Sequence, residues 1–456
     1  MPDAKIIDVN EVIEHQKLGR FQIMLGALLL VAMFVDGFEA QAPGFAAPAI
    51  IKDWGIPRAA MGFVFGAGNL GLMLGAVLLG ILGDRFGRKG TIVVGCLVLA
   101  VFSFMTMYAT DLTTLRLLRI GSGIGVGGVL PSVIALGTEF SPKRVQATTI
   151  WTLLIGYQAG ASSGALVSTL LFPLYGWQVM FLIGGILPIV TALLVLAFLP
   201  ESVRFLALDS AARDRMASVL VRIEPRLRLN PDTRLIVHEE KKSGFRLAHL
   251  FNEGRAAFTL LLWAVYVANL MALQFLLTWL PTVLESATVP HGIAATATVL
   301  VPAGGIVGGL ILSRFLDHGS IRPVAIAFAL GVPLVALIGS AGDSMPLLML
   351  ATFGAGCAVI GGQTNLHAAA GRFYPTFIRA NGIGWANGVG RVGSILGPVI
   401  GGVLIGLNLP SSQLFLFAAV PPLCAAIACF ALARLQAHRL GAPEADLAAQ
   451  PSHQSL

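Results

Sequence analysis

Long apolar segments recur through this chain, and they constrain its fold more than any other feature. A helix needs about 20 predominantly apolar residues to cross the hydrocarbon core of a bilayer. Inside a bilayer every backbone polar group must find its partner within the chain, so segments of this kind fold as helices. We therefore predict about twelve transmembrane helices, over residues 21–49, 59–81, 90–109, 113–138, 147–171, 177–199, 256–284, 292–315, 322–341, 345–369, 381–405 and 412–434.

The overall composition excludes a soluble protein. Hydrophobic residues make up 56% of the chain and charged residues only 12%, whereas soluble domains carry about 25% charged residues. The polar N-terminal segment, residues 1–20, shows no signal-peptide pattern, so we expect the first apolar segment to be retained as a helix. The four cysteines have no metal-ligand spacing, so neither a disulfide framework nor a metal site is expected.

The positions of the basic residues predict the orientation in the membrane. Most of the 30 Lys and Arg residues fall in the N-terminal arm, in the tail and in the loops that follow the even-numbered helices. Because cytoplasmic loops carry the excess of Lys and Arg, we expect both termini on the cytoplasmic side of a bacterial inner membrane. The formal net charge of +7 is therefore a topology signal and predicts no nucleic-acid partner.

Two halves of the chain repeat each other on either side of a charged segment. This cytoplasmic central loop, residues 200–255, separates an N-terminal arm and bundle (1–199) from a second bundle (256–434) and a cytoplasmic tail (435–456). One ungapped alignment of the halves, the repeat alignment, pairs Gly71 with Gly304, Gly75 with Gly308, Phe140 with Phe373, Pro142 with Pro375, Gly160 with Gly393 and Pro188 with Pro421. Duplicated six-helix halves are typical of secondary transporters, whose ligand site lies at the repeat interface.

Two acids, Asp36 and Glu39, lie inside the first apolar segment. A charge near the bilayer centre costs roughly 2.5 to 3.5 kcal/mol, so such acids usually mark a proton or substrate pathway. Their i, i+3 spacing places both on one helix face. The repeat alignment sets Asp36 opposite Asn269, so this acid belongs to one half only. We predict that Asp36 and Glu39 couple transport to protons; the alternative is an inert acid paired between helices.

The loop between the second and third predicted helices carries a motif. Residues 80–89, GILGDRFGRK, resemble the G-x-x-x-D-R-x-G-R-[RK] signature of the major facilitator superfamily, and residues 200–206 resemble its PESxR[WF]L element. The resemblance implies an all-α polytopic membrane protein with twelve transmembrane helices in two six-helix repeats, the major facilitator fold. In the second half a degraded copy of the motif keeps Asp317.

This motif also supplies the predicted cytoplasmic gate. We expect Gly80 to permit a close helix approach and Asp84 to accept hydrogen bonds from a neighbouring helix terminus. The basic residues should hold the gate closed. The gating candidates are Gly80, Asp84, Arg85, Gly87, Arg88, Asp317 and Arg379.

Other segments resemble one family of that superfamily more closely. The sequence DGFE at residues 36–39, the run FYPTFIRANG at 373–382 and the run GRVGSI at 390–395 are similar to signatures of the aromatic acid:proton symporter family. Glu39 stands where that family commonly has Asp, and His367 stands where it often has Asn. The resemblance extends over essentially all twelve segments and implies a substrate that is an aromatic carboxylate of the hydroxybenzoate type.

Arg391 is the only arginine well inside a membrane segment of the second half. Its planar guanidinium can bind a carboxylate in a bidentate manner, so we predict that it anchors the substrate. The alternative is that it bonds backbone carbonyls or an acid, because buried charges are generally paired. Other candidates for an apolar pocket with a few polar groups are Tyr266, Asn269, Gln274, Gln363, Asn365, His367 and Trp385.

Two further charged residues belong to the fourth predicted helix. Arg119 opens a Gly-rich run that resembles the superfamily element in which an arginine adjoins the proton route. Glu139 ends the same helix, where we expect a cytoplasmic charge network with Arg144 or Arg379. Both join Asp36 and Glu39 as candidates for proton coupling.

These patterns predict a proton-coupled importer of aromatic carboxylates that works by alternating access. No ATP-binding loop and no nucleophile–His–acid constellation occurs, so we predict no enzyme, and no cofactor besides the proton as coupling ion. The expected partners are the small carboxylate substrate, the proton and the lipid bilayer, and we expect a monomer. The alternative is a porter of the same superfamily for another organic acid, or a drug:proton exporter.

Overall fold

The computed structural model describes residues 6–16, 19–207, 213–223, 234–236, 247–252, 254–287, 289–316, 320–342 and 344–441. Contacts divide the chain into two compact units. Unit 1 comprises Met1–Lys242, Gln274–Pro302 and Ile395–Ser411, and unit 2 comprises Ser243–Leu273, Ala303–Ser394 and Ser412–Leu456.

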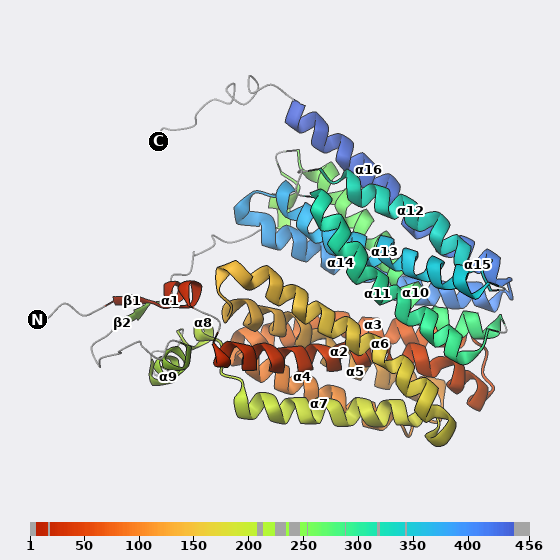
Figure 1. Ribbon diagram of the computed structural model, residues 1–456, viewed down its shortest axis with the longest axis horizontal. Coiled ribbons are helices and arrows are strands. Elements are labelled where there is room, and N and C mark those ends of the chain that lie inside the picture. The colour runs from red at the N-terminus through yellow and green to blue at the C-terminus, as the bar shows by residue number, and fades with distance from the viewer. Residues whose placement is uncertain are drawn as a thin grey trace, which may run out of the picture. The chain divides into compact units, whose positions relative to one another are not determined.

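Six long helices form the first half of the chain (Figure 1). They are α2 (Arg20–Trp54), α3 (Ala60–Phe86), α4 (Arg88–Thr106), α5 (Leu112–Glu139), α6 (Gln146–Tyr175) and α7 (Gln178–Phe198). Asp111 caps α5 by accepting hydrogen bonds from the backbone N–H groups of Thr113 and Thr114. Hydrogen bonds from Thr114, first from its hydroxyl, hold the pKa of Asp111 below its usual value.

Seven α-helices follow in the described residues of the second half. They are α10 (Ala256–Ser286), α11 (His291–Leu316), α12 (Arg322–Ile338), α13 (Met345–Phe373), α14 (Thr376–Gly406), α15 (Ser411–Ala418) and α16 (Val420–Gly441). The last predicted segment is therefore two helices, because the chain turns at Ala419. Pro421 and Pro422 follow in the first turn of α16, where a missing backbone N–H costs no helix hydrogen bond.

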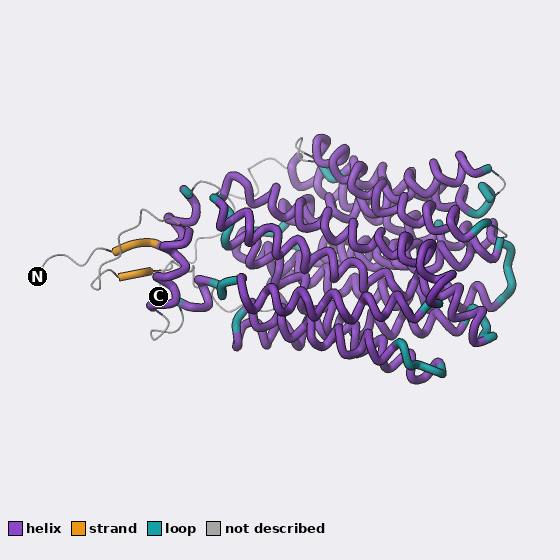
Figure 2. The backbone as a smooth tube through the Cα atoms, turned by 60° about the horizontal axis from the view of Figure 1, so that its bottom comes forward, coloured by secondary structure: helices purple, strands orange, loops and turns teal. Residues whose placement is uncertain are grey.

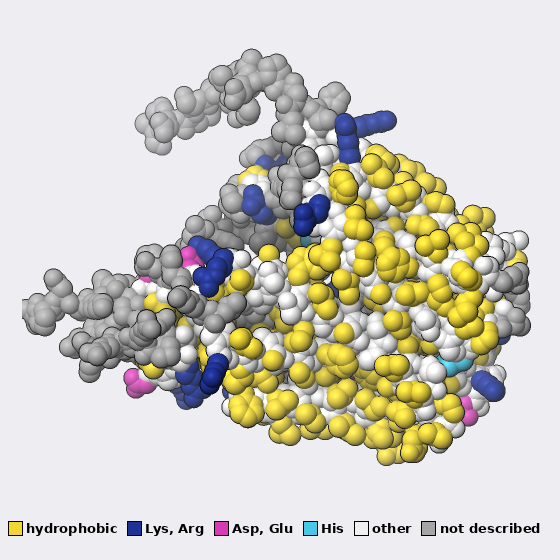
Figure 3. Space-filling view, in the orientation of Figure 1, with side chains coloured by type: hydrophobic (Ala, Val, Ile, Leu, Met, Phe, Trp, Pro, Cys, Tyr) yellow, Lys and Arg dark blue, Asp and Glu magenta, His cyan; other side chains and the backbone are white. Residues whose placement is uncertain are grey.

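Every predicted transmembrane segment coincides with helix in the described part of the chain. Within the described residues, ten helical spans are long and apolar enough to cross a membrane, with α15 and most of α16 counted together as one span. The helix α12 is shorter, with 17 residues. The helix α6 has 30 residues but is not among the ten. On the face shown in Figure 3, hydrophobic side chains cover the helices while charged side chains gather near helix ends, as a bilayer requires.

Close helix contacts confirm the internal repeat. A Cβ added at Gly71 of α3 would collide with the carbonyl oxygen of Ile120 on α5. In unit 2 a Cβ at Gly304 of α11 would collide with the carbonyl oxygen of Phe353 on α13. The repeat alignment pairs both the glycines and their neighbours. Small residues of this kind let membrane helices approach closely.

The same register relates two more pairs of helices. Gly160 of α6 lies against the carbonyl oxygen of Phe34 on α2, and Gly393 of α14 lies against that of Val267 on α10. At Gly80 the structure differs from our prediction, since a Cβ there would meet nothing within 4 Å. The close approach of α3 to α5 occurs instead at Gly71, which lies earlier in the same helix.

The arm and the central loop contain structure that we did not predict. The strands β1 (Ile6–Asp8) and β2 (Arg234–Ile236) pair in parallel, and Figure 2 shows them beside short helices. The helices nearby are α1 (Val9–His15), α8 (Val203–Leu206) and α9 (Arg213–Ile223). Their apolar side chains form a buried cluster with the ends of the unit 1 helices: Val9, Ile13, Phe140, Leu199, Val203, Leu206, Met216, Val219, Leu220 and Ile223.

Candidate functional site

A buried ion pair lies in unit 1. Glu39 of α2 and Arg119 of α5 are 3% and 2% exposed, and Nη1 of Arg119 is 3.9 Å from Oε2 of Glu39. Both were predicted for proton coupling, and the structure brings them together. The separation is long for a charge-assisted hydrogen bond, so the contact is mainly electrostatic.

Polar groups from α4 complete the surroundings of this pair. The Ser103 hydroxyl donates to Oε1 of Glu39 at 2.7 Å. Nη2 of Arg119 donates to the Thr106 hydroxyl at 2.9 Å. The guanidinium also lies over the ring of Phe181 on α7, 4.8 Å from its centroid, which is a cation–π geometry. Sequence reasoning missed Ser103 and Thr106, although the segment SFMT at residues 103–106 places two hydroxyls in an apolar helix.

The helix α7 leaves room for the carboxylate at a glycine. A Cβ added at Gly184 would collide with Oε1 of Glu39 and would lie 2.8 Å from the Ser103 hydroxyl oxygen. Any other residue at this position would therefore displace the carboxylate. This glycine was also missed in the sequence, because glycines are frequent throughout the chain.

Asp36 lies one turn before Glu39 on α2 and is 1% exposed. It is within electrostatic range of the Cys96 thiol on α4. Next to it, Gly37 lies against the carbonyl oxygen of Tyr157 on α6. Of the two acids predicted for proton coupling, Glu39 thus lies beside Arg119, and Asp36 lies near Cys96.

Gln274, a predicted pocket residue, belongs to unit 1. Its amide donates to the Asn69 side chain of α3 at 2.7 Å. Asn69 in turn donates to the carbonyl of Phe65 at 3.1 Å. Gln274 therefore belongs to a different unit from the other pocket candidates, which are part of unit 2.

Four of those candidates form one hydrogen-bonded network between α10 and α13 of unit 2. The Tyr266 hydroxyl is 2.8 Å from Nδ1 of His367, and Nε2 of His367 is 3.4 Å from the Gln363 amide nitrogen. The Asn269 amide donates to the Gln363 side-chain oxygen at 2.7 Å and to the Val359 carbonyl at 3.2 Å. The i, i+3 and i, i+4 spacings align these side chains along the two helices.

The network has a direction that follows from its donors and acceptors. Asn269 donates to the oxygen of Gln363, so the Gln363 nitrogen is left to donate to Nε2 of His367. A neutral His367 then carries its proton on Nδ1 and donates it to the Tyr266 oxygen. This assignment leaves the proton of the Tyr266 hydroxyl for a further acceptor.

The remaining pocket candidates lie differently. Asn365 donates to the carbonyls of Gly309 at 3.0 Å and Gly361 at 2.9 Å, so it ties α13 to α11. Arg391 is half-buried on α14, within electrostatic range of His367. Trp385 is 44% exposed.

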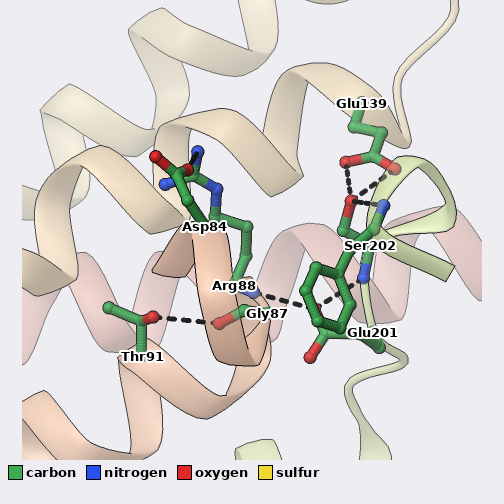
Figure 4. A network of polar contacts seen from close by, with 8 residues as sticks. Asp84, Gly87, Arg88, Thr91, Glu139, Glu201 and Ser202 are labelled. Carbon is green, nitrogen blue, oxygen red and sulfur yellow. Dashed lines mark hydrogen bonds and ion pairs between the residues drawn. The ribbon is translucent and has the colours of Figure 1, made fainter. Parts of the chain in front are cut away.

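The gate candidates differ from our prediction at Asp84 (Figure 4). The carboxylate of Asp84 is 73% exposed and pairs with Arg88 one turn later, at 2.7 Å. It is Glu201 that accepts hydrogen bonds at a helix terminus. Its Oε1 receives the backbone N–H groups of Arg88 at 2.9 Å and Lys89 at 3.1 Å, at the start of α4. Gly87 between the helices has φ +91° and leaves space for the Glu201 carboxylate.

Glu139 also has partners other than the predicted ones. Its carboxylate accepts the Ser202 hydroxyl at 2.7 Å and the backbone N–H of Arg204 at 2.9 Å, as Figure 4 shows in part. Arg144 instead donates to the backbone carbonyl of Gln16 at 3.0 Å. Glu139 therefore caps the short helix α8 rather than joining a network of arginines.

The contacts of Asp84, Arg88 and Glu139 surround a cavity, and the remaining gate candidates make other contacts. A cavity of about 530 Å³ is lined by Asp84, Arg88, Glu139, Gln146, Ser202 and Arg204 among others. Arg85 lies over the ring of Phe86, 5.5 Å from its centroid. Arg379 donates to the Tyr374 carbonyl at 3.5 Å, and Asp317 lies outside the described residues.

Comparison with known proteins decides the family. Residues 29–375 match the family model described as Major Facilitator Superfamily. The chain belongs to this superfamily. Within it, the chain belongs to the aromatic acid transporters, and it is therefore a transporter and not an enzyme.

Relatives align over almost the whole length of this major facilitator protein. The 4-hydroxybenzoate transporter PcaK of Acinetobacter baylyi is 34% identical over 93% of this chain and 94% of its own. The gallate transporter of Pseudomonas putida is 34% identical over 93% and 95%. The 3-(3-hydroxy-phenyl)propionate transporter of Escherichia coli is 32% identical over 91% and 94%.

Solved structures agree on the fold. A bacterial homologue of the lysosomal transporter Spinster has a TM-score of 0.68 at 16% identity, over 92% of this chain and 98% of its own. The xylose transporter XylE of E. coli has a TM-score of 0.69 at 14% identity, over 90% and 97%. The protein therefore has the predicted major facilitator fold and is a multi-pass membrane protein.

Proposed function

We propose that this protein imports aromatic carboxylates of the hydroxybenzoate type together with protons, by alternating access, across a bacterial inner membrane. Both termini are cytoplasmic in this proposal, the proton is the coupling ion without any other cofactor, and the transporter is a monomer. Relatives named for 4-hydroxybenzoate, gallate and a hydroxyphenylpropionate support the substrate class, since they align over more than 90% of the chain.

The observation that carries proton coupling is the buried pair of Glu39 and Arg119. With Glu39 ionised, the two charges cancel at 3.9 Å. When Glu39 takes up a proton, Arg119 becomes a buried cation without its counter-ion, which is costly in low dielectric. The positive charge that then remains favours binding of an anionic substrate. Proton binding and anion binding therefore favour each other, which is what symport requires.

Recognition of the ring rests on the network of unit 2. The directed chain from Asn269 to Tyr266 leaves the tyrosine hydroxyl as a donor, and a ring hydroxyl or carboxylate can accept its proton. Arg391 lies within electrostatic range of His367 and offers the bidentate fork that suits a carboxylate. Such groups in an apolar surrounding give orientation and selectivity.

The test is uptake into proteoliposomes of purified protein with a labelled 4-hydroxybenzoate and an imposed pH gradient. Accumulation against the substrate gradient, abolished by a protonophore, is the expected result. The Glu39→Gln variant should exchange substrate without accumulating it. The control Thr191→Ala, which removes a buried hydroxyl bonded to its own helix, should accumulate like the parent.

Three results would contradict the proposal. Accumulation by Glu39→Gln equal to that of the parent would exclude this acid as a coupling group. If the protein accumulated non-aromatic organic acids but no aromatic acid, the proposed substrate class would be wrong. Movement of substrate outward when protons move inward would indicate an exporter.

A further inference from the structure

The surroundings of Glu39 contain a group that can follow its protonation state. We propose that Ser103 and Gly184 are positioning residues for Glu39, and that the Ser103 hydroxyl reverses its hydrogen bond when Glu39 gains or loses its proton. This inference rests on the proton-coupling role of Glu39 proposed above.

The Ser103 hydroxyl has two acceptors within reach. Its oxygen is 2.7 Å from Oε1 of Glu39 and 3.1 Å from the backbone carbonyl oxygen of Phe181. A hydroxyl has one hydrogen and two lone pairs, so it donates to one of these acceptors at a time. Ser103 is fully buried, so water does not take the place of either partner.

In each protonation state of Glu39, the Ser103 hydroxyl keeps a hydrogen bond to the carboxyl group without movement of heavy atoms. When Glu39 is ionised, Ser103 donates to the carboxylate and strengthens a charge-assisted bond. When Glu39 is protonated, its own O–H donates to the Ser103 oxygen, and Ser103 turns its hydrogen to the Phe181 carbonyl. The proton on Glu39 and the proton of the Ser103 hydroxyl thereby both keep an acceptor.

Phe181 connects this hydroxyl to the arginine. Its carbonyl is the second acceptor of Ser103, and its ring lies under the Arg119 guanidinium. Through Phe181, the helix α7 thus contacts Arg119 directly and Glu39 by way of Ser103. A change in the protonation of Glu39 therefore alters two contacts of Phe181: the one between its carbonyl and Ser103, and the one between its ring and Arg119.

Gly184 fixes where the carboxylate lies. A methyl group there would occupy the position of Oε1 of Glu39 and would come within 2.8 Å of the Ser103 oxygen. The neighbouring Gly185 offers a matched control. A Cβ at Gly185 would lie 2.7 Å from ring atoms of Phe104, so it disturbs packing without touching the carboxylate.

The charged groups that face Glu39 are few in the described chain. Arg119 faces it from α5 at 3.9 Å, and Asp36 lies one turn away on its own helix. The contacting groups on α4 and α7 are hydroxyls, a carbonyl, an aromatic ring and a glycine, none of which titrates near neutral pH. Because Asp36 is a second buried acid on the same helix, a change in pH dependence after substitution of Ser103 or Gly184 reports on Glu39 when the infrared band of Glu39 moves with it.

The experiment measures two properties of purified protein in proteoliposomes. The first is the pH at which exchange of labelled 4-hydroxybenzoate is half-maximal, with equal pH on both sides. The second is the infrared carbonyl band of protonated Glu39, identified by its loss in Glu39→Gln. The variants are Ser103→Ala and Gly184→Ala, and the controls are Thr191→Ala and Gly185→Ala.

Loss of the Ser103 donor disfavours the ionised form more than the protonated form, because hydrogen bonds to charged groups are the stronger ones. In Ser103→Ala we expect the pH midpoint of exchange to rise by about one unit. We also expect the Glu39 band to move to higher wavenumber, because the carboxyl loses a hydrogen-bond partner. Gly184→Ala should move both readouts, whereas both controls should keep the values of the parent.

Two outcomes separate this inference from the proposed function. If Ser103→Ala and Gly184→Ala keep the midpoint and the band of the parent while Glu39→Gln loses both, the positioning role is wrong and proton coupling by Glu39 stands. If Glu39→Gln itself keeps the pH dependence of the parent, the proposed coupling role fails and this inference fails with it.

Discussion

Replacing Glu39 with glutamine should separate anion binding from proton binding. Glutamine has nearly the shape of a protonated glutamate and carries no charge. In the Glu39→Gln variant, Arg119 loses the carboxylate 3.9 Å away from it. The uncompensated positive charge of Arg119 then favours an anionic substrate whatever the pH. The variant should bind the aromatic acid with an affinity that does not follow pH.

The structure sets the size of this effect. Two unit charges 3.9 Å apart interact by about 4 kcal/mol at an effective dielectric constant of about 20. The side chains of Arg119 and Glu39 are 3% and 0% exposed, so screening by salt is small. Desolvation of the ions lowers the net value. If only a third of the Coulomb energy remains, about 1.4 kcal/mol, Kd already changes tenfold. We expect at least this difference in Kd between the parent and the Glu39→Gln variant.

The assay is equilibrium binding of labelled 4-hydroxybenzoate to protein in nanodiscs, from mildly acidic to mildly alkaline pH. For the parent, Kd should rise with pH as Glu39 loses its proton. For Glu39→Gln, Kd should stay flat and should be at least tenfold lower than that of the parent at the alkaline end. The reasoning is refuted if the Kd of the variant follows pH as the parent does, or if it binds more weakly at every pH.

Three other substitutions test the remaining contacts. Arg391→Ala should weaken binding of an aromatic acid by about ten- to a hundredfold and leave its uncharged amide unchanged, with Arg391→Lys between them; equal losses for acid and amide would make this arginine structural. Tyr266→Phe should raise the Kd of a ring-hydroxylated acid by about three- to tenfold, and a parent-like Kd would contradict its donor role. Glu201→Ala removes the acceptor at the start of α4 and should lower the free energy of unfolding by about 1 kcal/mol, seen as a lower thermal midpoint. Asp84→Asn is the control for that loss, since its exposed pair contributes about 0 to 1 kcal/mol; it should slow transport without changing Kd, and an equal loss of stability would refute the capping role of Glu201.

The membrane helices could be predicted from the sequence because one physical requirement governs them. Burial in a bilayer demands long apolar helices, and this demand is visible in each segment by itself. The central loop follows no such rule. Its helix α9 (Arg213–Ile223) places Met216, Val219, Leu220 and Ile223 at helical spacing, but this short pattern in a charged segment predicts a helix only with a partner to pack against.

The residues of the site were predictable to different degrees. Tyr266, Asn269, Gln363 and His367 are large polar groups in apolar segments, so each is conspicuous alone, and the structure joins them. Ser103 and Gly184 were missed, because small hydroxyls and glycines are frequent in membrane helices for packing reasons. Their role depends on the carboxylate of Glu39, which comes from a different helix.

The repeat alignment also shows how the chemistry is divided between the halves. It pairs the residues of the charged cluster with uncharged ones: Glu39 with Ala272, Ser103 with Ala336 and Arg119 with Thr352. In the other direction, it pairs most of the polar network with apolar residues: Tyr266 with Met33, Gln363 with Leu130 and His367 with Ile134. The glycine contacts between helices are kept in both units, so the frame is common while the polar groups are not.

Physical cost accounts for this division. Each ion buried away from water carries a penalty of several kcal/mol, so a second charged cluster in unit 2 would add that cost again without adding a coupling step. A neutral network such as that of Asn269, Gln363, His367 and Tyr266 joins its members by hydrogen bonds and carries no penalty for a buried charge. Asp36 and Asn269 occupy equivalent positions, and this one pair illustrates the difference: an acid in the half that contains the Glu39–Arg119 pair, and its amide in the half with the hydrogen-bonded network. In the function that we propose, the duplicated frame therefore supports proton exchange in one unit and directed hydrogen bonding in the other.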